Sequence, residues 1–335
     1  MMKSFIPAKS FTTRHAYAYK YFGTRSKLTT NTNTGQHQHH YQSQQPTIRR
    51  RYPILTSMTT QYTINDEVCP PMDPAELKKI VKKHCVSMER FLENKPIARH
   101  TQAAFDQIFP FVDSNKKVIL DSGCGTARST ILLGEMFPDH TVIGIDRSFV
   151  RLSRNALSNK GIQDDEDEDN DNDNNDEQSL SMENAPSEES LRPFQAVSSN
   201  TLLVRAELTD FWRCCLKSGW DITHHFIYYP NPYPKKNRVK KRFYAHPSFP
   251  LILQIGGEIS LRSNWEGYLK EFAQSVEYAH DVYDQNFMKD FALPYLEDAM
   301  NGPLERTDKS IAFTNFEKKY DDVGEKTFEL KLRRQ

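Results

Sequence analysis

The sequence predicts an α/β fold built on a doubly wound, mostly parallel sheet with antiparallel edge strands. Apolar runs typical of strands alternate with amphipathic stretches typical of helices from residue 117 to residue 279. Strands that are separated by helices pair in parallel. The first strand pattern also passes through a turn with two glycines into a helix, which is typical of a Rossmann-like fold.

The elements follow in order along the chain. A helical pattern runs from Pro74 to about Phe109, with apolar residues three and four positions apart. We then expect strands at Lys117–Leu120, Thr141–Ile145, Leu202–Arg205, His225–Tyr229 and Glu258–Arg262. We expect helices at Arg128–Phe137, Phe149–Lys160, Asp210–Leu216, Ser248–Gln254 and Trp265–Ala279. Two late extended runs predict antiparallel edge strands at Ala312–Phe316 and Thr327–Leu332.

Residues 1–65 have the composition of a targeting leader. They contain nine Lys or Arg and no Asp or Glu, and they are rich in Ser, Thr and Gln. This composition is typical of a mitochondrial or plastid transit peptide. The second interpretation is a disordered extension of a protein of the cytoplasm or nucleus, with Met58 as an alternative start. We expect one domain over residues 66–335.

A dense acidic tract interrupts that domain. Residues 164–189 carry thirteen acidic side chains and no Lys or Arg. Such a run repels itself and has too few apolar residues to bury, so we expect a disordered insertion over residues 164–190. Outside the leader and the tract, 35 basic and 31 acidic residues remain. The total charge therefore gives no argument for a nucleic-acid partner, and the local distribution of charge must decide.

The remaining composition excludes several classes of protein. No run of eighteen apolar residues exists, so we expect no membrane partner. The five cysteines form no CxxC pair, which indicates a reducing compartment and no metal site. A His-rich cluster at residues 37–40 is interpreted as low complexity rather than as a metal site. The oligomeric state is left open.

Residues 117–130, KVILDSGCGTARST, contain the first chemical signal. A strand ends at Asp121, and Gly123 and Gly125 precede a helix. Glycine lets a backbone approach a ligand closely, and a helix N-terminus offers free N–H groups. A carboxylate at the strand end suits the amino group of a sulfonium ligand better than a pyrophosphate. Asp146, 21 residues after Gly125, ends the second strand and can accept both hydroxyls of a ribose.

Together these features resemble the class I S-adenosylmethionine-dependent methyltransferases. The resemblance implies S-adenosyl-L-methionine as the cofactor, bound by Asp121, Gly123, Gly125 and Asp146. Glu207, just after the third strand, is a further candidate for the adenine amino group. The alternative interpretations are an NAD site or a strand–helix turn without a ligand.

Residues 226–246, FIYYPNPYPKKNRVKKRFYAH, contain the second signal. Prolines restrict the backbone around Asn231 and Tyr233, which follow the fourth strand directly. Six basic residues then occur within eight positions: Lys235, Lys236, Arg238, Lys240, Lys241 and Arg242. This basic strip is expected to bind RNA phosphates, with neighbouring aromatic rings for base stacking. The alternatives are a solvated loop or a second localisation signal.

Four motifs in order resemble the tRNA (guanine-N7) methyltransferase family. They are Pro230–Lys236, Gly256–Gly257, Ser263–Trp265 and Thr314–Lys319, and the similarity extends from about Lys117 to Tyr320 outside the acidic tract. The resemblance implies that Asn231 occupies the place of the catalytic Asp and Asn264 that of a second functional Asp. It also implies that Thr314 and Glu317 contact substrate and cofactor.

The chain departs from the family at three of these positions. Asn231 and Asn264 stand where the family has Asp, and Tyr233 stands where it has Trp. Guanine N7 has a free lone pair, so its methylation needs positioning and electrostatics rather than a general base. A carboxylate accepts from both N1–H and N2–H of guanine, whereas an amide offers one acceptor and one donor. The change weakens the assignment to guanine and is closer to the Asn-Pro-Pro-Tyr motif of enzymes that methylate amino groups.

The sequence thus predicts a divergent methyltransferase that acts on guanine N7 in tRNA. One alternative is methylation of another base or another RNA. A second alternative, from a different class, is a catalytically weak RNA-binding protein that retains the fold. Cofactor binding followed by methyl incorporation into tRNA separates these classes.

Overall fold

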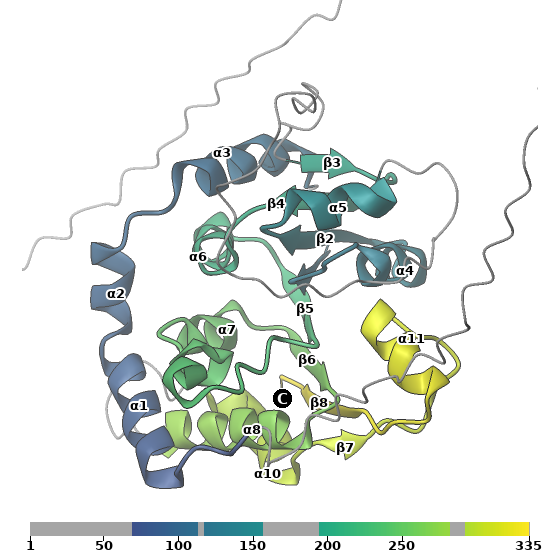
Figure 1. The fold of residues 1–335 in the computed structure, drawn as a ribbon. Coiled ribbons are helices and arrows are strands. Elements are labelled where there is room, and N and C mark those ends of the chain that lie inside the picture. Colours follow the sequence, from purple (N-terminus) through teal and green to yellow (C-terminus); the bar gives the residue numbers. More distant parts are fainter. Residues whose placement is uncertain (1–68, 113–116, 157–193, 282–291, 335) are drawn as a thin grey trace, which may run out of the picture. The chain divides into compact units, whose positions relative to one another are not determined.

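The computed structural model describes residues 69–112, 117–156, 194–281 and 292–334. The predicted leader and the acidic tract both lie outside these residues. Within the described ranges, eight strands form one mixed sheet in the order β3-β4-β2-β1-β5-β6-β8-β7 (Figure 1). Among the helices described, none has the length and apolar character that a membrane crossing requires.

The centre of the sheet is parallel, as predicted. Its five strands are β1 (Lys117–Ser122), β2 (His140–Asp146), β4 (Thr201–Arg205), β5 (Ile222–Tyr228) and β6 (Glu258–Ser263). The strands β2 and β4 lie on one side of β1, and β5 and β6 lie on the other. The strand order therefore reverses between β1 and β5, and open α/β sheets bind ligands beyond the carboxyl ends of their strands at such a point.

The antiparallel edges differ in part from the prediction. Strand β8 (Phe328–Leu332) pairs antiparallel with β6, which confirms the run at Thr327–Leu332. Two short antiparallel strands were not predicted, β3 (Phe194–Ala196) and β7 (Leu304–Glu305). The predicted strand at Ala312–Phe316 is wrong, because helix α11 (Asn315–Asp322) begins inside it. The extended backbone of Thr314 belongs to a helix cap, since its side chain accepts the N–H of Glu317.

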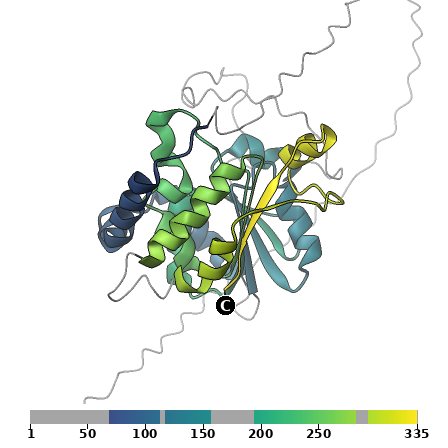
Figure 2. The ribbon, with the colours of Figure 1, turned by 90° about the horizontal axis from the view of Figure 1, so that it is seen from below.

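Helices cover both faces of the sheet (Figure 2). The predicted helical region from Pro74 divides into three helices, and Pro96 lies between the second and the third. The helices before the glycine turn are α1 (Pro74–Val86), α2 (Met88–Asn94) and α3 (Arg99–Ile108). The later ones are α4 (Arg128–Met136), α5 (Phe149–Ala156), α6 (Leu208–Ser218), α7 (Phe249–Ile255), α8 (Glu266–Asp281) and α10 (Leu296–Asn301). Short 3₁₀ turns include η3 (Lys236–Lys241) and η4 (Phe243–Ala245).

The core lies on both faces because successive strand residues point to opposite sides. Val118 and Leu120 of β1 belong to the large apolar cluster that also includes residues of α1, α3, α6, α7 and α8. Ile119 packs in a smaller cluster with Leu133 of α4. Helix α4 approaches β2 closely, since a Cβ atom built on Gly144 would lie 2.4 Å from Oγ1 of Thr130. This packing fixes the start of α4, and with it the glycine turn, against the sheet.

Candidate functional site

The predicted site residues follow the carboxyl ends of the parallel strands. Gly123 and Gly125 come after β1, Asp146 ends β2 and Glu207 comes after β4. Asn231 and Asn264 follow β5 and β6. Because these strands are parallel neighbours, the sheet brings their ends to one edge. Strand pairing thus brings Gly125 and Asn231, which are 106 residues apart in the sequence, to the same edge of the sheet.

The glycine turn after β1 has a backbone that few residues tolerate. Gly123 and Gly125 have φ of 80° and 57°, and Ala127 has a φ of 68°. The N–H groups of Gly123 and Cys124 both donate to the carbonyl of Ile145, at 2.8 and 3.1 Å. A Cβ atom on Gly125 would meet no atom within 4 Å. Gly125 is therefore required for its conformation, and it leaves open space beside the backbone.

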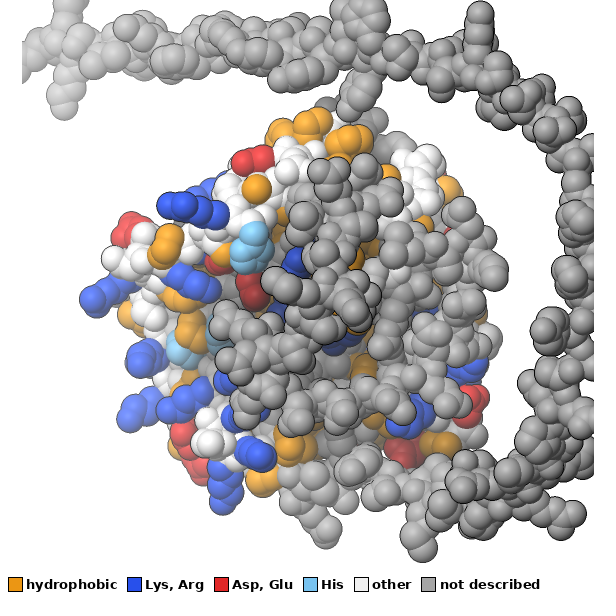
Figure 3. Space-filling model, turned by 45° about the horizontal axis from the view of Figure 1, so that its top comes forward, with side chains coloured by type: hydrophobic (Ala, Val, Ile, Leu, Met, Phe, Trp, Pro, Cys, Tyr) orange, Lys and Arg blue, Asp and Glu red, His pale blue; other side chains and the backbone are white. Residues whose placement is uncertain are grey.

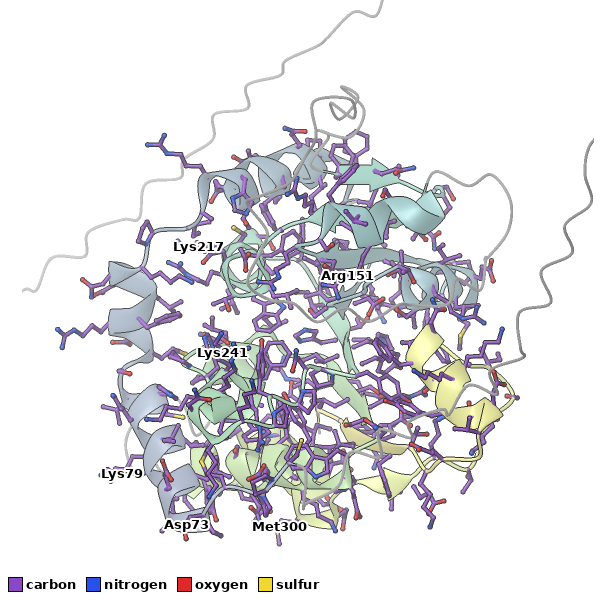
Figure 4. The ribbon with its side chains drawn as sticks, viewed as in Figure 1. Asp73, Lys79, Arg151, Lys217, Lys241 and Met300 are labelled. Carbon is purple, nitrogen blue, oxygen red and sulfur yellow. The ribbon has the colours of Figure 1, made fainter. Side chains whose placement is uncertain are left out.

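Asp146 connects this turn to the end of β2. Its side chain is 4% exposed, and Oδ2 accepts the N–H of Gly125 at 3.0 Å. Its Oδ1 accepts the N–H of Ser148 at 2.7 Å and lies 3.3 Å from Nη2 of Arg151, which Figure 4 labels. A carboxylate offers about four acceptor positions, so capacity for a hydroxyl donor remains. Asp146, the predicted ribose acceptor, therefore also stabilises the glycine turn.

The structure gives Asp121 a role in the fold. This side chain is 1% exposed, and its Oδ2 accepts the hydroxyls of Ser129 and Thr130 at 2.6 and 2.7 Å. Burial raises the pKa of Asp121 to about 6. The contacts hold the first turn of α4 against the end of β1. Asp121 therefore shapes the glycine turn, and its contact with the cofactor remains a prediction.

Glu207 lies where the sequence placed it. It is exposed and forms the N-cap position of α6, directly after β4. Its backbone N–H donates to Oγ1 of Thr101 at 3.1 Å, which connects α3 to this edge of the sheet. Its carboxylate is accessible to a ligand at the ends of β2 and β4.

The segment after β5 has an unusual backbone. Tyr229 and Tyr233 have φ of 48° and 43°, a region that bulky residues rarely adopt. Asn231 is exposed, and its Oδ1 accepts the N–H of Tyr233 at 3.0 Å. Its acceptor atom therefore closes its own turn, and its NH₂ group remains as a donor. We name residues 230–234 the proline loop.

Asn264 follows β6 and carries a polar atom that needs a partner. Its Nδ2 is buried, and within the described residues no hydrogen-bond acceptor reaches it. The neighbouring Ser263 accepts the N–H of Trp265 at 3.0 Å and so fixes the end of the strand. Buried donors are almost always satisfied, so Asn264 fits a position that contacts a ligand or a water molecule.

The structure contradicts the predicted substrate contact of Glu317. The side chain is fully buried. Its Oε1 lies 3.0 Å from Nη1 of Arg262 and 3.3 Å from Nε of Arg306, and it accepts the hydroxyl of Tyr229 at 3.3 Å. Its Oε2 accepts the N–H of Phe313. Glu317 is thus the centre of a buried ionic cluster that holds α11 against β6 and supports Tyr229 at the start of the proline loop.

Thr314 is likewise used by the fold. Its hydroxyl accepts the N–H of Glu317 at 3.0 Å and caps α11. Thr314 is partly exposed, so its predicted contact remains a prediction. A Thr three residues before a Glu is the sequence signature of a helix start, and this signal could have identified the cap in advance.

The basic strip divides into exposed residues and one buried residue. Lys235, Lys236, Lys240 and Lys241 are exposed, and Arg238 is partly exposed. The ammonium of Lys241 lies 5.8 Å from the ring centre of Tyr233. Lysines in this position can meet phosphates next to an aromatic ring.

Arg242 is the buried residue of the basic strip, and the prediction that it contacts a phosphate is wrong. Its side chain is 0% exposed and pairs with Glu271 of α8 at 3.2 Å. Its Nε donates to the carbonyl of Pro232 at 2.8 Å, and its guanidinium lies 4.6 Å from the ring centre of Trp265. Arg242 therefore connects the proline loop to α8.

Two further residues at this edge were not identified from the sequence. Arg128, at the start of α4, donates from Nε to the carbonyl of Ala312 at 3.0 Å and so joins the glycine turn to the segment before α11. Arg262 lies 4.8 Å from the ring centre of Tyr228 while it binds Glu317. Their partners are distant in sequence, so no local pattern marks them. In the described part of the chain, no group of three or more His, Cys, Asp or Glu side chains could hold a metal ion.

The chain is similar to known methyltransferases in sequence and in structure. A family model described as "Putative methyltransferase" matches residues 115–330. None of the curated proteins matches the chain. Among solved structures, an antibiotic-related methyltransferase is 13% identical with a TM-score of 0.33, and the match covers 71% of this chain and 96% of that one. The 16S rRNA methyltransferase KamB is 11% identical with a TM-score of 0.34, over 71% of this chain and 95% of that one. A 16S rRNA (adenine(1408)-N(1))-methyltransferase from Catenulisporales acidiphilia is 11% identical with a TM-score of 0.33, over 78% of this chain and 91% of that one.

Proposed function

The chain belongs to the methyltransferase family whose model matches residues 115–330, and we propose that it methylates guanine N7 in tRNA. The family match agrees with the resemblance to the tRNA (guanine-N7) methyltransferases that the four motifs carry. The cofactor is S-adenosylmethionine. The observation that supports the proposal most is the junction of the glycine turn and the proline loop at adjacent strand ends, β1 and β5.

The residues at the ends of β1, β2 and β4 fit this cofactor. Gly125 leaves open space where a side chain would otherwise stand. Asp146 keeps acceptor capacity for the ribose hydroxyls, and Glu207 is exposed for the adenine amino group. When bound, S-adenosylmethionine supplies an electrophilic methyl group, which an unprotonated ring nitrogen accepts without a general base. The protein's own task is therefore to position the base and to stabilise the charge that develops on it.

The residues after β5 and β6 fit that task. Arg242 donates to the carbonyl of Pro232 in the proline loop, and Tyr229, just before the loop, donates to Glu317. These contacts restrict the segment that carries Asn231 and Tyr233. The NH₂ group of Asn231 and the buried Nδ2 of Asn264 can make polar contacts with a base. The exposed lysines of the basic strip suit RNA phosphates next to the base.

A second candidate function is methylation of another base. The two amides favour it, because an amide pairs with an adenine or cytosine edge through one donor and one acceptor. Nucleoside mass spectrometry of tRNA that the purified protein has methylated tests both candidates. We expect 7-methylguanosine as the product. A methylated adenosine or cytidine would replace the guanine assignment, and absence of any methylated nucleoside together with tight RNA binding would favour a catalytically weak RNA-binding protein.

For residues 1–65 we propose import into a mitochondrion or plastid. Their acid-free, Arg-containing composition supports this proposal. Fusion of these residues to a fluorescent protein should direct it to one of the two organelles. A diffuse signal in cytoplasm or nucleus would favour the start at Met58 instead.

A further inference from the structure

Helix α1 carries a basic face beside its buried stripe. Its buried residues Leu77, Val81 and Cys85 repeat at intervals of four and form one stripe. Lys79 and Lys82 are exposed, and so is Lys83. In the part of the chain that the structure describes, none of these three forms an ion pair, whereas the neighbouring Lys78 pairs with Asp281 of α8 at 3.0 Å.

Helix stability alone does not explain this charge. Lysines at positions i and i+4, such as Lys79 and Lys83, repel each other by about 0.2–0.5 kcal/mol. Lys83 lies in the last turn, where the helix dipole favours a cation. Lys79 and Lys82 lie before that turn and gain little from the dipole. A bound anion would offset their repulsion.

The fold fixes α1 beside the basic strip. The carboxylate of Glu271 accepts the N–H of Met72, just before α1, and also binds Arg242, the last residue of the strip. At the other end of α1, Nε2 of His84 lies 3.1 Å from the carbonyl of Ala245 in η4. Both ends of α1 are therefore attached to the segment that contains the strip.

Positive charges on α1 and on the basic strip act on the same side chain, His84. Burial lowers the pKa of His84, and the charges of Lys83 on α1 and Lys240 on η3 lower it further. One imidazole thus lies in the field of both elements. Figure 3 shows Lys and Arg side chains gathered along the side of the molecule on which α1 and α2 lie. Figure 4 labels Lys79 on α1 and Lys241, the last residue of η3.

We propose that Lys79 and Lys82 bind phosphates of the substrate RNA that lie away from the methylated nucleotide. This inference rests on RNA as the substrate of the proposed function. A helix of 13 residues is roughly 20 Å long, so α1 and the strip together suit a folded RNA rather than a short single strand. The family match covers residues 115–330, so α1 lies outside the matched range.

The test compares Lys79→Gln/Lys82→Gln with a control of equal charge, Lys270→Gln/Lys326→Gln. The control lysines are exposed and pair with Glu266 and Glu305 elsewhere on the surface. Equilibrium binding of an unmodified tRNA transcript is measured without cofactor over a range of salt concentrations. Each lost phosphate contact lowers the slope of log Kd against log salt by about 0.7–0.9, so we expect a fall of about 1.5 and a several-fold weaker Kd. The control should keep the original slope.

A short single-stranded RNA around the target guanosine should bind the α1 variant and the unaltered protein equally. An unchanged slope for the full transcript, with thermal unfolding unaltered, would overturn the inference. So would a loss of affinity for vesicles containing anionic lipid without a loss for tRNA, which would assign the face to a membrane. Binding and methylation are measured separately, so tRNA binding through α1 without 7-methylguanosine would defeat the proposed function and leave this inference standing.

Discussion

Arg242 and Glu271 form a buried ion pair in which Nη1 lies 3.2 Å from Oε2. Arg242 is the sixth basic residue of a strip whose other members lie at the surface, yet it points inward to α8. Through Pro232 and Tyr233 it also binds two carbonyls of the proline loop. The same run of basic residues therefore contains surface cations and one structural cation, and the two kinds should respond differently to substitution.

Lys240→Gln/Lys241→Gln should weaken tRNA binding and leave the free energy of unfolding nearly unchanged. Two lost phosphate contacts should lower the salt slope of binding by about 1.5. Arg242→Gln should instead reduce the free energy of unfolding by about 3–5 kcal/mol, because it leaves Glu271 charged and buried. Urea unfolding and salt titrations of binding measure the two effects. Equal stability of the two variants would contradict the buried role of Arg242.

Glu317→Gln should destabilise the fold by about 3–5 kcal/mol, because Arg262 and Arg306 would lose their shared buried partner. The matched control is Glu305→Gln, which removes an exposed ion pair with Lys326 and should leave the free energy of unfolding nearly unchanged. Urea unfolding compares them. A stable Glu317→Gln protein with only a raised KM for tRNA would restore the contact with substrate that the sequence predicted.

Asp146→Ala should weaken binding of S-adenosylmethionine, since it removes the proposed ribose acceptor and releases the N–H of Gly125. Affinity for tRNA should stay nearly the same. Arg151→Gln is the control, because Arg151 touches the same carboxylate from the exposed side. Calorimetric titration with the cofactor decides, and equal cofactor affinity of Asp146→Ala and Arg151→Gln would count against the assignment.

Asp121→Asn should change the dependence of stability on pH. Burial raises the pKa of Asp121 from 3.8 to about 6, so the folded state binds this proton more tightly than the unfolded state does. That contribution to stability is complete below about pH 4 and is lost as pH rises through about 6. The asparagine variant should therefore gain on the order of 2–3 kcal/mol relative to the original protein between pH 4 and pH 7. Urea unfolding at both pH values measures the difference, and a constant difference would refute the assigned shift.

Asn231→Asp tests which base is methylated. An aspartate can still accept the N–H of Tyr233, so the turn should survive. If guanine N7 is the target, a carboxylate suits the N1–H and N2–H edge and the developing positive charge, so the rate should hold or rise. If the amide instead binds the edge of adenine or cytosine, the carboxylate would leave one polar group of the base without a hydrogen bond. The loss would cost roughly 1–3 kcal/mol and should reduce the rate strongly. Single-turnover methyl transfer, with the product identified by mass spectrometry, separates the two. Asn264→Asp extends the test to the second amide.

The parallel strands, the glycine turn and the proline loop were predictable from the sequence. Each is encoded within a few neighbouring residues, since apolar periodicity marks strands and helices and glycine or proline marks the turns. The exposed lysines of the basic strip were predictable for the same reason. The strand prediction at Ala312–Phe316 failed because Thr314, although extended, is the N-cap of α11. An N-cap residue and a strand residue share the same extended backbone conformation.

Only the tertiary structure decided which charged side chains are exposed and which are buried. Asp121, Arg242 and Glu317 all occur in motifs that suggest contact with cofactor or substrate, yet each is buried. A charge can be buried only where partners satisfy it. For Arg242 that partner lies 29 residues away on α8, and for Glu317 one lies 55 residues away on β6. The sequence by itself determined the glycine turn and the proline loop of the candidate site, and long-range ion pairing determined that Arg242 and Glu317 hold the fold.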